Sequence, residues 1–323
     1  MFNNVNVNVA LDVNKAFNDA GKGLYDLFFP FDFKLKKELE KACLEGNTEK
    51  ITEIVQSAGL LNKLGLVHIG QINNIQQVLY KAQPLIQNPE NEQIDPKKRD
   101  KILEAIKFEY DEQAQDLWAK LIAGEINNPS SYSIRTIEVL KNLSMEEAQL
   151  FQNIAPYISI FCGIVSILSP IFWKPNAISS PLNFESQLKL VNAGLFVSNS
   201  LNGDGGTAIS TDFTDTTYSM KTIGETFDIL EFPKRRALLC ASRKMDINTP
   251  FSIPCILLTQ EGKEILQLID SSSENELNYE YLKNLSLHFK SYFDLLNIIV
   301  YKNATKQLDG NYRYEELEKI ELE

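Results

Sequence analysis

The sequence has few of the residues from which catalytic sites are usually built. Among 323 residues there are only two histidines, His68 and His288, and no nucleophile motif such as GxSxG accompanies either. A Ser-His-Asp or Cys-His site would have to use one of them, and we expect both to be structural. Acidic pairs such as Glu146–Glu147 leave a metal-dependent hydrolytic cluster open, although such charges in lysine-rich helices usually form a solvated face. We therefore expect no enzymatic activity and no cofactor.

Cysteine is also scarce, and its spacing fits neither a metal site nor a disulfide framework. There is no CxxC pair, and no histidine lies at ligand spacing from any of the four cysteines, which are Cys43, Cys162, Cys240 and Cys255. A zinc site needs such clustered ligands, and small secreted domains carry denser, paired cysteines. We expect reduced, buried thiols in a cytoplasmic protein, and no metal.

Positive charge is in deficit: Lys and Arg total 32 against 43 Asp and Glu, for a net charge of −11. Nucleic-acid binding needs clustered basic residues that displace counterions from phosphate, so the acidic excess disfavours it. One basic cluster exists around the β-prone stretch 237–242. Its residues could form a nucleic-acid-binding hairpin or a merely solubilising one, and both remain open; they are Lys234, Arg235, Arg236, Arg243 and Lys244.

A targeting signal and long membrane-spanning runs are lacking as well. The N-terminal MFNNVNVNVALDV has no basic region and no continuous apolar stretch, so it does not resemble a signal peptide. The run YISIFCGIVSILSPIFW at 157–173 carries no charge, but serines and a proline interrupt it, and it reaches only the short end of a bilayer span. We predict a buried core helix there. Membrane insertion on activation, through this run or the aromatic segment near Phe28, is the alternative.

Periodicity predicts a helical N-terminal and central part. Alternating valines and asparagines at 5–9 indicate a strand, which would serve as an ordered arm or for oligomerisation. Helices are then predicted at 14–29, in a hairpin at 35–55 with Asn47 as a cap, and at 69–85. Asp95–Pro96 starts the next helical region, whose apolar stripe at 102–122 could be broken at Tyr110–Asp111. A further helix is predicted at 134–140, and Ser144 and Glu147 form a capping box at the start of another.

After residue 194 the pattern becomes mixed. Short β-prone runs occur at 195–197, 226–232, 237–241 and 255–258. Thr259 is a candidate cap for a helix through Ile269, a last helix is predicted at 279–296, and the acidic tail should be frayed. We predict an α+β protein with three parts: an N-terminal arm and helical hairpin (1–62), a helical domain (63–175) and a smaller C-terminal α/β domain (176–323).

One stretch resembles a known family. Residues 113–152, QAQDLWAKLIAGEINNPSSYSIRTIEVLKNLSMEEAQLFQ, are similar to a characteristic block of a bacterial family of unknown function, which in this block is similar to the Abi-alpha abortive-infection proteins. Weaker likeness extends over residues 65–290, at 71–75, NAGLF and LTQEG. The matching residues of the block are Leu117, Trp118, Ala119, Gly124, Glu125, Pro129, Ser133, Arg135, Thr136, Leu140, Leu143, Ser144, Glu147 and Phe151.

The resemblance implies phage defence by association and supplies no catalytic residues. The pattern of GLF and LTQEG resembles a winged-helix-like element in the C-terminal part. Physically, Trp118 is a candidate packing anchor, while Gly124 and Pro129 shape a tight connection. Arg135 can reach the end of the preceding helix, where a cation is favoured, and we expect Glu125 and Arg135 to pair or to share a network.

The sequence therefore favours a non-enzymatic bacterial phage-defence or regulatory protein that acts through protein–protein contacts or self-association. Two alternatives remain: a membrane-active effector that uses 157–173, and a nucleic-acid-binding regulator that uses the basic hairpin at 233–244.

Overall fold

The computed structural model describes most of the chain between residues 69 and 322. The described residues are 69–87, 94–161, 164–168, 182–198, 207–211, 222–223, 226–234, 236–241, 251–269, 279–290, 296–306 and 312–322, with six positions between 38 and 53. The predicted strand at 5–9, the helix at 14–29 and most of the hairpin at 35–55 lie outside them. Asn47 is described, and its Oδ1 accepts a hydrogen bond from the Lys50 N–H at 3.0 Å, as expected of a helix cap.

The chain divides into two compact units, Met1–Lys141 and Asn142–Glu323. This division differs from the predicted boundary at residue 175. The reason is that strands at 158–168, just before that boundary, pair with strands from the C-terminal part of the chain. The other predicted boundary, at residue 62, lies outside the described residues.

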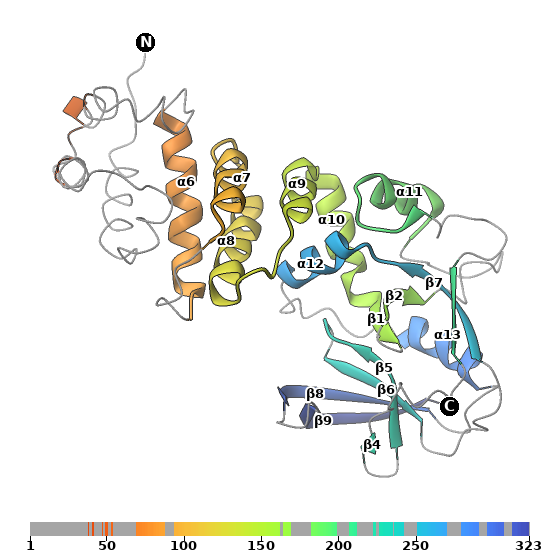
Figure 1. Ribbon diagram of the computed structural model, residues 1–323. Coiled ribbons are helices and arrows are strands. Elements are labelled where there is room, and N and C mark those ends of the chain that lie inside the picture. The colour runs from red at the N-terminus through yellow and green to blue at the C-terminus, as the bar shows by residue number, and fades with distance from the viewer. Residues whose placement is uncertain are drawn as a thin grey trace. The chain divides into compact units, whose positions relative to one another are not determined.

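The described part of the first unit is helical. α6 (Ile69–Ala82), α7 (Pro96–Ile106) and α8 (Glu112–Asn127) lie side by side (Figure 1). A 3₁₀ turn at Gln83–Leu85 follows α6, and α9 (Ile134–Asn142) follows α8. Of the predicted stripe at 102–122, Ile102, Ile106, Trp118, Leu121 and Ile122 are buried, whereas Tyr110 is exposed; α6 buries Ile75 and Leu79 beside them.

The helix starts in this unit are where the sequence predicts them. The Asp95 carboxylate accepts hydrogen bonds from the N–H groups of Lys97 and Lys98 at 3.0 and 3.1 Å, and Pro96 is the first residue of α7. The apolar stripe breaks before Asp111, whose carboxylate accepts from the Ala114 N–H at 2.9 Å and caps α8. The predicted break is therefore confirmed.

The second unit is built on an antiparallel sheet. The described strands number nine, in the order β3-β7-β2-β1-β5-β6-β8-β9, with β4 paired to β5. Their bounds are β1 Ile158–Phe161, β2 Ile164–Leu168, β3 Thr207–Thr211, β4 Thr222–Ile223, β5 Thr226–Phe232, β6 Ala237–Ala241, β7 Phe251–Leu257, β8 Leu296–Lys306 and β9 Tyr312–Leu322. The helices of this unit are α10 Met145–Ile154, α11 Phe184–Asn192, α12 Gln260–Leu268 and α13 Tyr279–Phe289. The predicted α+β class is confirmed.

The run at 157–173 does not form the predicted core helix. Its described residues form the hairpin β1–β2, with Ile158 opposite Ile167 and Phe161 opposite Ile164. β2 also pairs with β7 and β1 with β5, so the hairpin lies inside the sheet. A short apolar run is ambiguous by periodicity alone. Its β-branched residues favour a strand, and sheet pairing on both sides decides the outcome.

α13 covers one face of the sheet. Its residues Leu285 and Phe289 pack in one apolar cluster with Phe161, Leu239 and Ile298, and the rings of Phe161 and Phe289 meet edge to face at 6.3 Å. α13 ends at Phe289, short of the predicted end at 296, and β8 begins at Leu296. The acidic tail is also not frayed: it forms β9, an 11-residue strand paired with β8.

Candidate functional site

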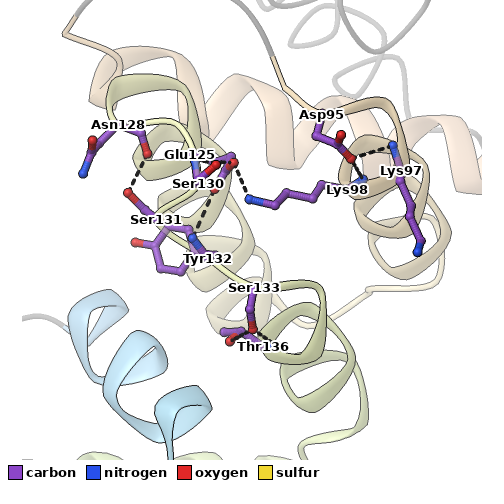
Figure 2. A network of polar contacts seen from close by, with 10 residues as sticks. All are labelled: Asp95, Lys97, Lys98, Glu125, Asn128, Ser130, Ser131, Tyr132, Ser133 and Thr136. Atoms are coloured by element: carbon purple, nitrogen blue, oxygen red, sulfur yellow. Dashed lines mark hydrogen bonds and ion pairs between the residues drawn. The ribbon is translucent and has the colours of Figure 1, made fainter.

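The block at 113–152 is organised around one buried carboxylate, Glu125, in the last turn of α8. Its side chain is 3% exposed. Oε1 accepts hydrogen bonds from the Lys98 ammonium at 2.7 Å and from the Ser130 N–H at 2.8 Å, while Oε2 accepts from the Tyr132 N–H at 3.1 Å (Figure 2). Both oxygens are thus engaged by donors from α7 and from the connection to α9.

The Lys98 ammonium balances the negative charge of Glu125. It lies in the first turn of α7, where Asp95 accepts a hydrogen bond from its backbone N–H, and its side chain is 12% exposed. Buried ions lose hydration, so such a pair is stable only when the geometry is good and the remaining lone pairs are occupied. The two backbone donors to Glu125 meet this requirement. The pair therefore fixes α7 against the end of α8.

The connection that Glu125 holds contains a tight turn at residues 128–131. The Ser131 N–H donates to the Asn128 carbonyl at 3.2 Å, Pro129 occupies the second position, and Ser130 has a φ of 70°. Proline followed by a residue with positive φ is the pattern of a type II turn. A serine in this region is strained, and the hydrogen bond from its N–H to Glu125 compensates for the strain. Pro129 thus shapes the connection, as predicted.

Gly124 is required because Tyr132 lies directly over it. A Cβ atom at position 124 would be 2.7 Å from the Tyr132 hydroxyl and 2.8 Å from Cε2 of its ring. Tyr132 is 6% exposed, so its ring has little room to move away. The glycine therefore allows the returning chain to pack on α8, which places the Tyr132 N–H within reach of Glu125.

Side chains cap the starts of the next two helices, and the sequence predicts the second of these caps. In α9 the Thr136 N–H donates to the Ser133 hydroxyl at 3.1 Å. In α10 the Glu147 N–H donates to the Ser144 hydroxyl, and the Ser144 N–H donates back to the Glu147 carboxylate at 2.8 Å. The predicted capping box is thus confirmed.

Sequence reasoning found some of these residues and missed others. Trp118 is 2% exposed, as expected of a packing anchor. Arg135 lies exposed on α9, and its pairing with Glu125 stays a prediction. Lys98 was missed because 27 residues separate it from Glu125 and no local pattern links them. Tyr132 was missed as well, although an aromatic residue directly after a proline turn, with a glycine in the last turn of the preceding helix, is a usable signal.

In the second unit, two weaker family-like segments meet each other. The Thr259 hydroxyl donates to the Gly194 carbonyl at 2.6 Å, and the Thr259 N–H donates to the Leu195 carbonyl at 3.0 Å. A Cβ at Gly262 would lie 2.2 Å from the Leu195 carbonyl oxygen, so α12 starts in direct contact with the GLF turn. The segments NAGLF and LTQEG are therefore one packing unit. Their winged-helix-like character stays a prediction.

At least one residue of the basic cluster, Lys234, has a structural role. The Lys234 ammonium donates to the Ile269 carbonyl at 2.6 Å, at the C-terminal end of α12, where a cation is favourable. Arg236 is exposed in the turn before β6, with a φ of 47°. Arg235, Arg243 and Lys244 lie outside the described residues, as does His68, while His288 lies on α13. A basic surface for nucleic acid stays a prediction.

Surface ion pairs join α7 to α9. The Lys101 ammonium is 2.7 Å from Glu138, and hydrogen bonding to Glu138 raises the pKa of Lys101. Lys141 donates to Glu104 at 3.2 Å, and this hydrogen bond together with the charge of Lys141 lowers the pKa of Glu104. These pairs are exposed, so each contributes little to stability.

The described residues offer neither a metal cluster nor a membrane-spanning helix. They contain no group of three or more His, Cys, Asp or Glu side chains placed to hold a metal ion. None of their helices combines the length and the apolar content needed to cross a membrane. Cys240 and Cys255 are buried, as predicted, and form no disulfide, while Cys43 and Cys162 lie outside the described residues.

Comparison with known proteins gives one match. Residues 63–166 match the model of a family described as a protein of unknown function (DUF2806). The matched segment covers less than half of the chain and extends from before α6 to β2, so it contains the whole network around Glu125. No curated protein and no solved structure matches the chain. The match shows which segment of the chain resembles the family, and the family description names no activity.

Proposed function

We propose that the chain is a non-enzymatic bacterial phage-defence or regulatory protein, which acts in the cytoplasm through protein–protein contacts. The observation that carries this proposal is the burial and hydrogen bonding of Glu125. It is the most deeply buried acid of the family-like block, and both its oxygens hold the connection between α8 and α9. A carboxylate used in this way positions backbone and is closed to a substrate.

The other residues of the block support the same interpretation. Trp118 and Thr136 are buried, Gly124 receives the Tyr132 ring, and Ser144 and Glu147 cap α10. Each of these roles stabilises a helix or a connection between helices. A block used in this way forms a rigid platform, and a rigid platform suits a protein that recognises a partner. The defence part of the proposal rests on the resemblance to the abortive-infection proteins.

The membrane alternative is less well supported. β1 and β2 have partners on both sides in the sheet, and Phe161 and Leu168 are buried in its core. To enter a membrane, this hairpin would have to leave β5 and β7. That step would break the central hydrogen bonds of the second unit and expose its core to water.

A plating assay tests the proposal. Bacteria that express the chain are challenged with a panel of phages, beside cells with an empty vector and cells with Glu125→Gln, Lys98→Met or the surface control Glu104→Gln. We expect the wild type and Glu104→Gln to lower plating by the same factor. The two site variants should lose protection only as far as their folded fraction falls, measured on the purified proteins.

Two outcomes contradict the proposal. If Glu125→Gln folds fully and abolishes protection, the carboxylate has a chemical role. If no phage is restricted, the defence part fails. Retention of DNA or RNA that falls steeply with salt and depends on Arg236 would favour the nucleic-acid alternative instead.

A further inference from the structure

The loop between α7 and α8 presents two aromatic side chains to solvent. Phe108 is 56% exposed and Tyr110 is 70% exposed, whereas α7 and α8 on either side bury their apolar residues. The two residues are separated by one position in a loop with polar neighbours. Exposed apolar surface rimmed by polar residues commonly marks a protein interaction site, and tyrosine is enriched among the residues that dominate binding energy. The pair lies in the segment that the family model matches.

The loop is held rigidly, so this exposure is not a consequence of a loose chain. The Phe108 N–H donates to the Ala105 carbonyl at 3.2 Å, and the Glu109 N–H donates to the Ile106 carbonyl at 3.1 Å. The Asp111 N–H then donates to the Glu109 carboxylate at 3.0 Å. The N–H groups of Phe108, Glu109 and Asp111 are therefore all hydrogen-bonded to neighbouring residues.

Two buried amide side chains anchor the loop from the adjacent helices. Asn74 of α6, which is 5% exposed, donates to the Lys107 carbonyl at 3.1 Å. Gln115 of α8, which is 7% exposed, donates to the Glu109 carbonyl at 3.0 Å. The backbone that carries Phe108 and Tyr110 is therefore ordered before any partner arrives, and ordering it on binding costs little free energy.

The charged residues around the two rings indicate which kind of partner the loop would bind. Residues 107–112 carry three carboxylates, Glu109, Asp111 and Glu112, and a single lysine. Lys107 lies over the Phe108 ring, 5.0 Å from its centroid, which shows that this ring accepts a cation. The Glu112 side chain is 88% exposed, and its distance of 3.9 Å to Lys81 marks a weak pair. Aromatic faces beside exposed carboxylates are complementary to an arginine or lysine side chain.

We propose that the loop 107–112 is the docking surface for a basic segment of a protein partner, in which an arginine or lysine stands beside an apolar residue. The cation would contact the Tyr110 ring and the exposed Glu112 carboxylate, and the apolar residue would pack beside Phe108. This inference rests on the proposed function, since it identifies the surface through which the chain makes its protein contacts.

The test uses the full chain and a random peptide display library. Enriched peptides are synthesised with a fluorophore, each beside a matched peptide in which every arginine and lysine is replaced by glutamine. Binding is measured by fluorescence anisotropy for the wild type, Phe108→Ala/Tyr110→Ala, Glu112→Gln and the control Leu287→Ala. Leu287 is a comparable control because it is an apolar side chain, 57% exposed, in the other unit.

We expect the enriched peptides to be basic. Replacing their charges, or removing both aromatic rings, should weaken binding about tenfold or more, as for the loss of central interface residues. Glu112→Gln should weaken binding less and reduce its salt dependence, and Leu287→Ala should change nothing. Thermal unfolding of each variant checks the fold, which exposed substitutions should preserve.

The proposal is overturned if the library yields no bound peptide, if neutral or acidic peptides are enriched, or if the double aromatic variant binds as well as the wild type. It is also overturned if sedimentation shows that the wild type self-associates and that the double variant does not, because the occupant would then be a second copy. If the chain binds basic peptides through this loop but does not lower phage plating, the docking surface is supported and the defence function is rejected.

Discussion

The Lys98 ammonium lies 2.7 Å from Oε1 of Glu125, although 27 residues separate the two in sequence. This contact joins the first turn of α7 to the last turn of α8. Because Glu125 also accepts hydrogen bonds from the Ser130 and Tyr132 N–H groups, one carboxylate fixes two helices and the turn that follows them.

Loss of one partner of this pair should be strongly destabilising. Lys98→Met leaves the Glu125 charge buried without its cation, and we expect a loss of about 3–5 kcal/mol in the free energy of unfolding of the first unit. Urea denaturation followed by circular dichroism measures it. Lys101→Met is the matched control, since Lys101 lies on the same helix and is also 2.7 Å from its partner carboxylate, but its side chain is 38% exposed. Equal losses for the two variants would contradict the special role of the buried pair.

The two close-packed glycines should differ in their tolerance of a methyl group. At Gly124 the added Cβ meets a side chain, Tyr132, and we expect Gly124→Ala to cost about 1–3 kcal/mol. At Gly262 it meets the backbone carbonyl of Leu195 at 2.2 Å, which moves only if the chain moves. Gly262→Ala should therefore be the more damaging change, measured by thermal unfolding. A Gly262→Ala protein as stable as the wild type would show that α12 does not contact the GLF turn.

Asn297 on β8 should be replaceable with a gain in stability. It is fully buried, and neither its Nδ2 nor its Oδ1 has a hydrogen-bond partner. Its cross-strand neighbour is Cys240, which belongs with Ile299 to an apolar cluster on the sheet. We expect Asn297→Leu to raise the free energy of unfolding of the second unit by about 1–3 kcal/mol, because an unpaired buried amide is costly. A loss of stability would show that the amide binds a water molecule or another polar group.

The Glu104–Lys141 pair gives a predicted pH dependence. Its hydrogen bond lowers the pKa of Glu104 below the ordinary value of 4.5. The folded state therefore favours the charged form, so this contribution to stability is present above pH 4.5 and is lost as the pH falls through the lowered pKa. The difference in unfolding free energy between the wild type and Glu104→Gln should shrink over that range. A difference that does not change with pH would refute the pairing.

The sequence predicted the elements whose signals are local. Asp95, Asp111, Ser144 and Thr259 were identified as helix caps because a short polar side chain stands directly before an apolar periodic run. Two strands, Thr226–Phe232 and Ala237–Ala241, were predicted with the bounds that the structure gives them. Composition and local chemistry were sufficient for these elements.

The elements that depend on distant partners were not predictable. The hairpin β1–β2 is stabilised by β5 and β7, which follow it by dozens of residues, and β9 forms from an acidic tail only because β8 pairs with it. The site shows the same limit. The sequence indicates Glu125, but its partner Lys98 is identified only by the fold, which brings the first turn of α7 to the last turn of α8.

Amide hydrogen exchange at Ser130 and Tyr132 shows whether Glu125 is closed to substrates, because these two N–H groups donate to its carboxylate. We predict that both exchange only through unfolding of the first unit, and that both lose protection in Lys98→Met. Exchange at the rate of an unstructured peptide, or a change in protection when a divalent metal ion or a nucleotide is added, would mean that Glu125 faces an open site.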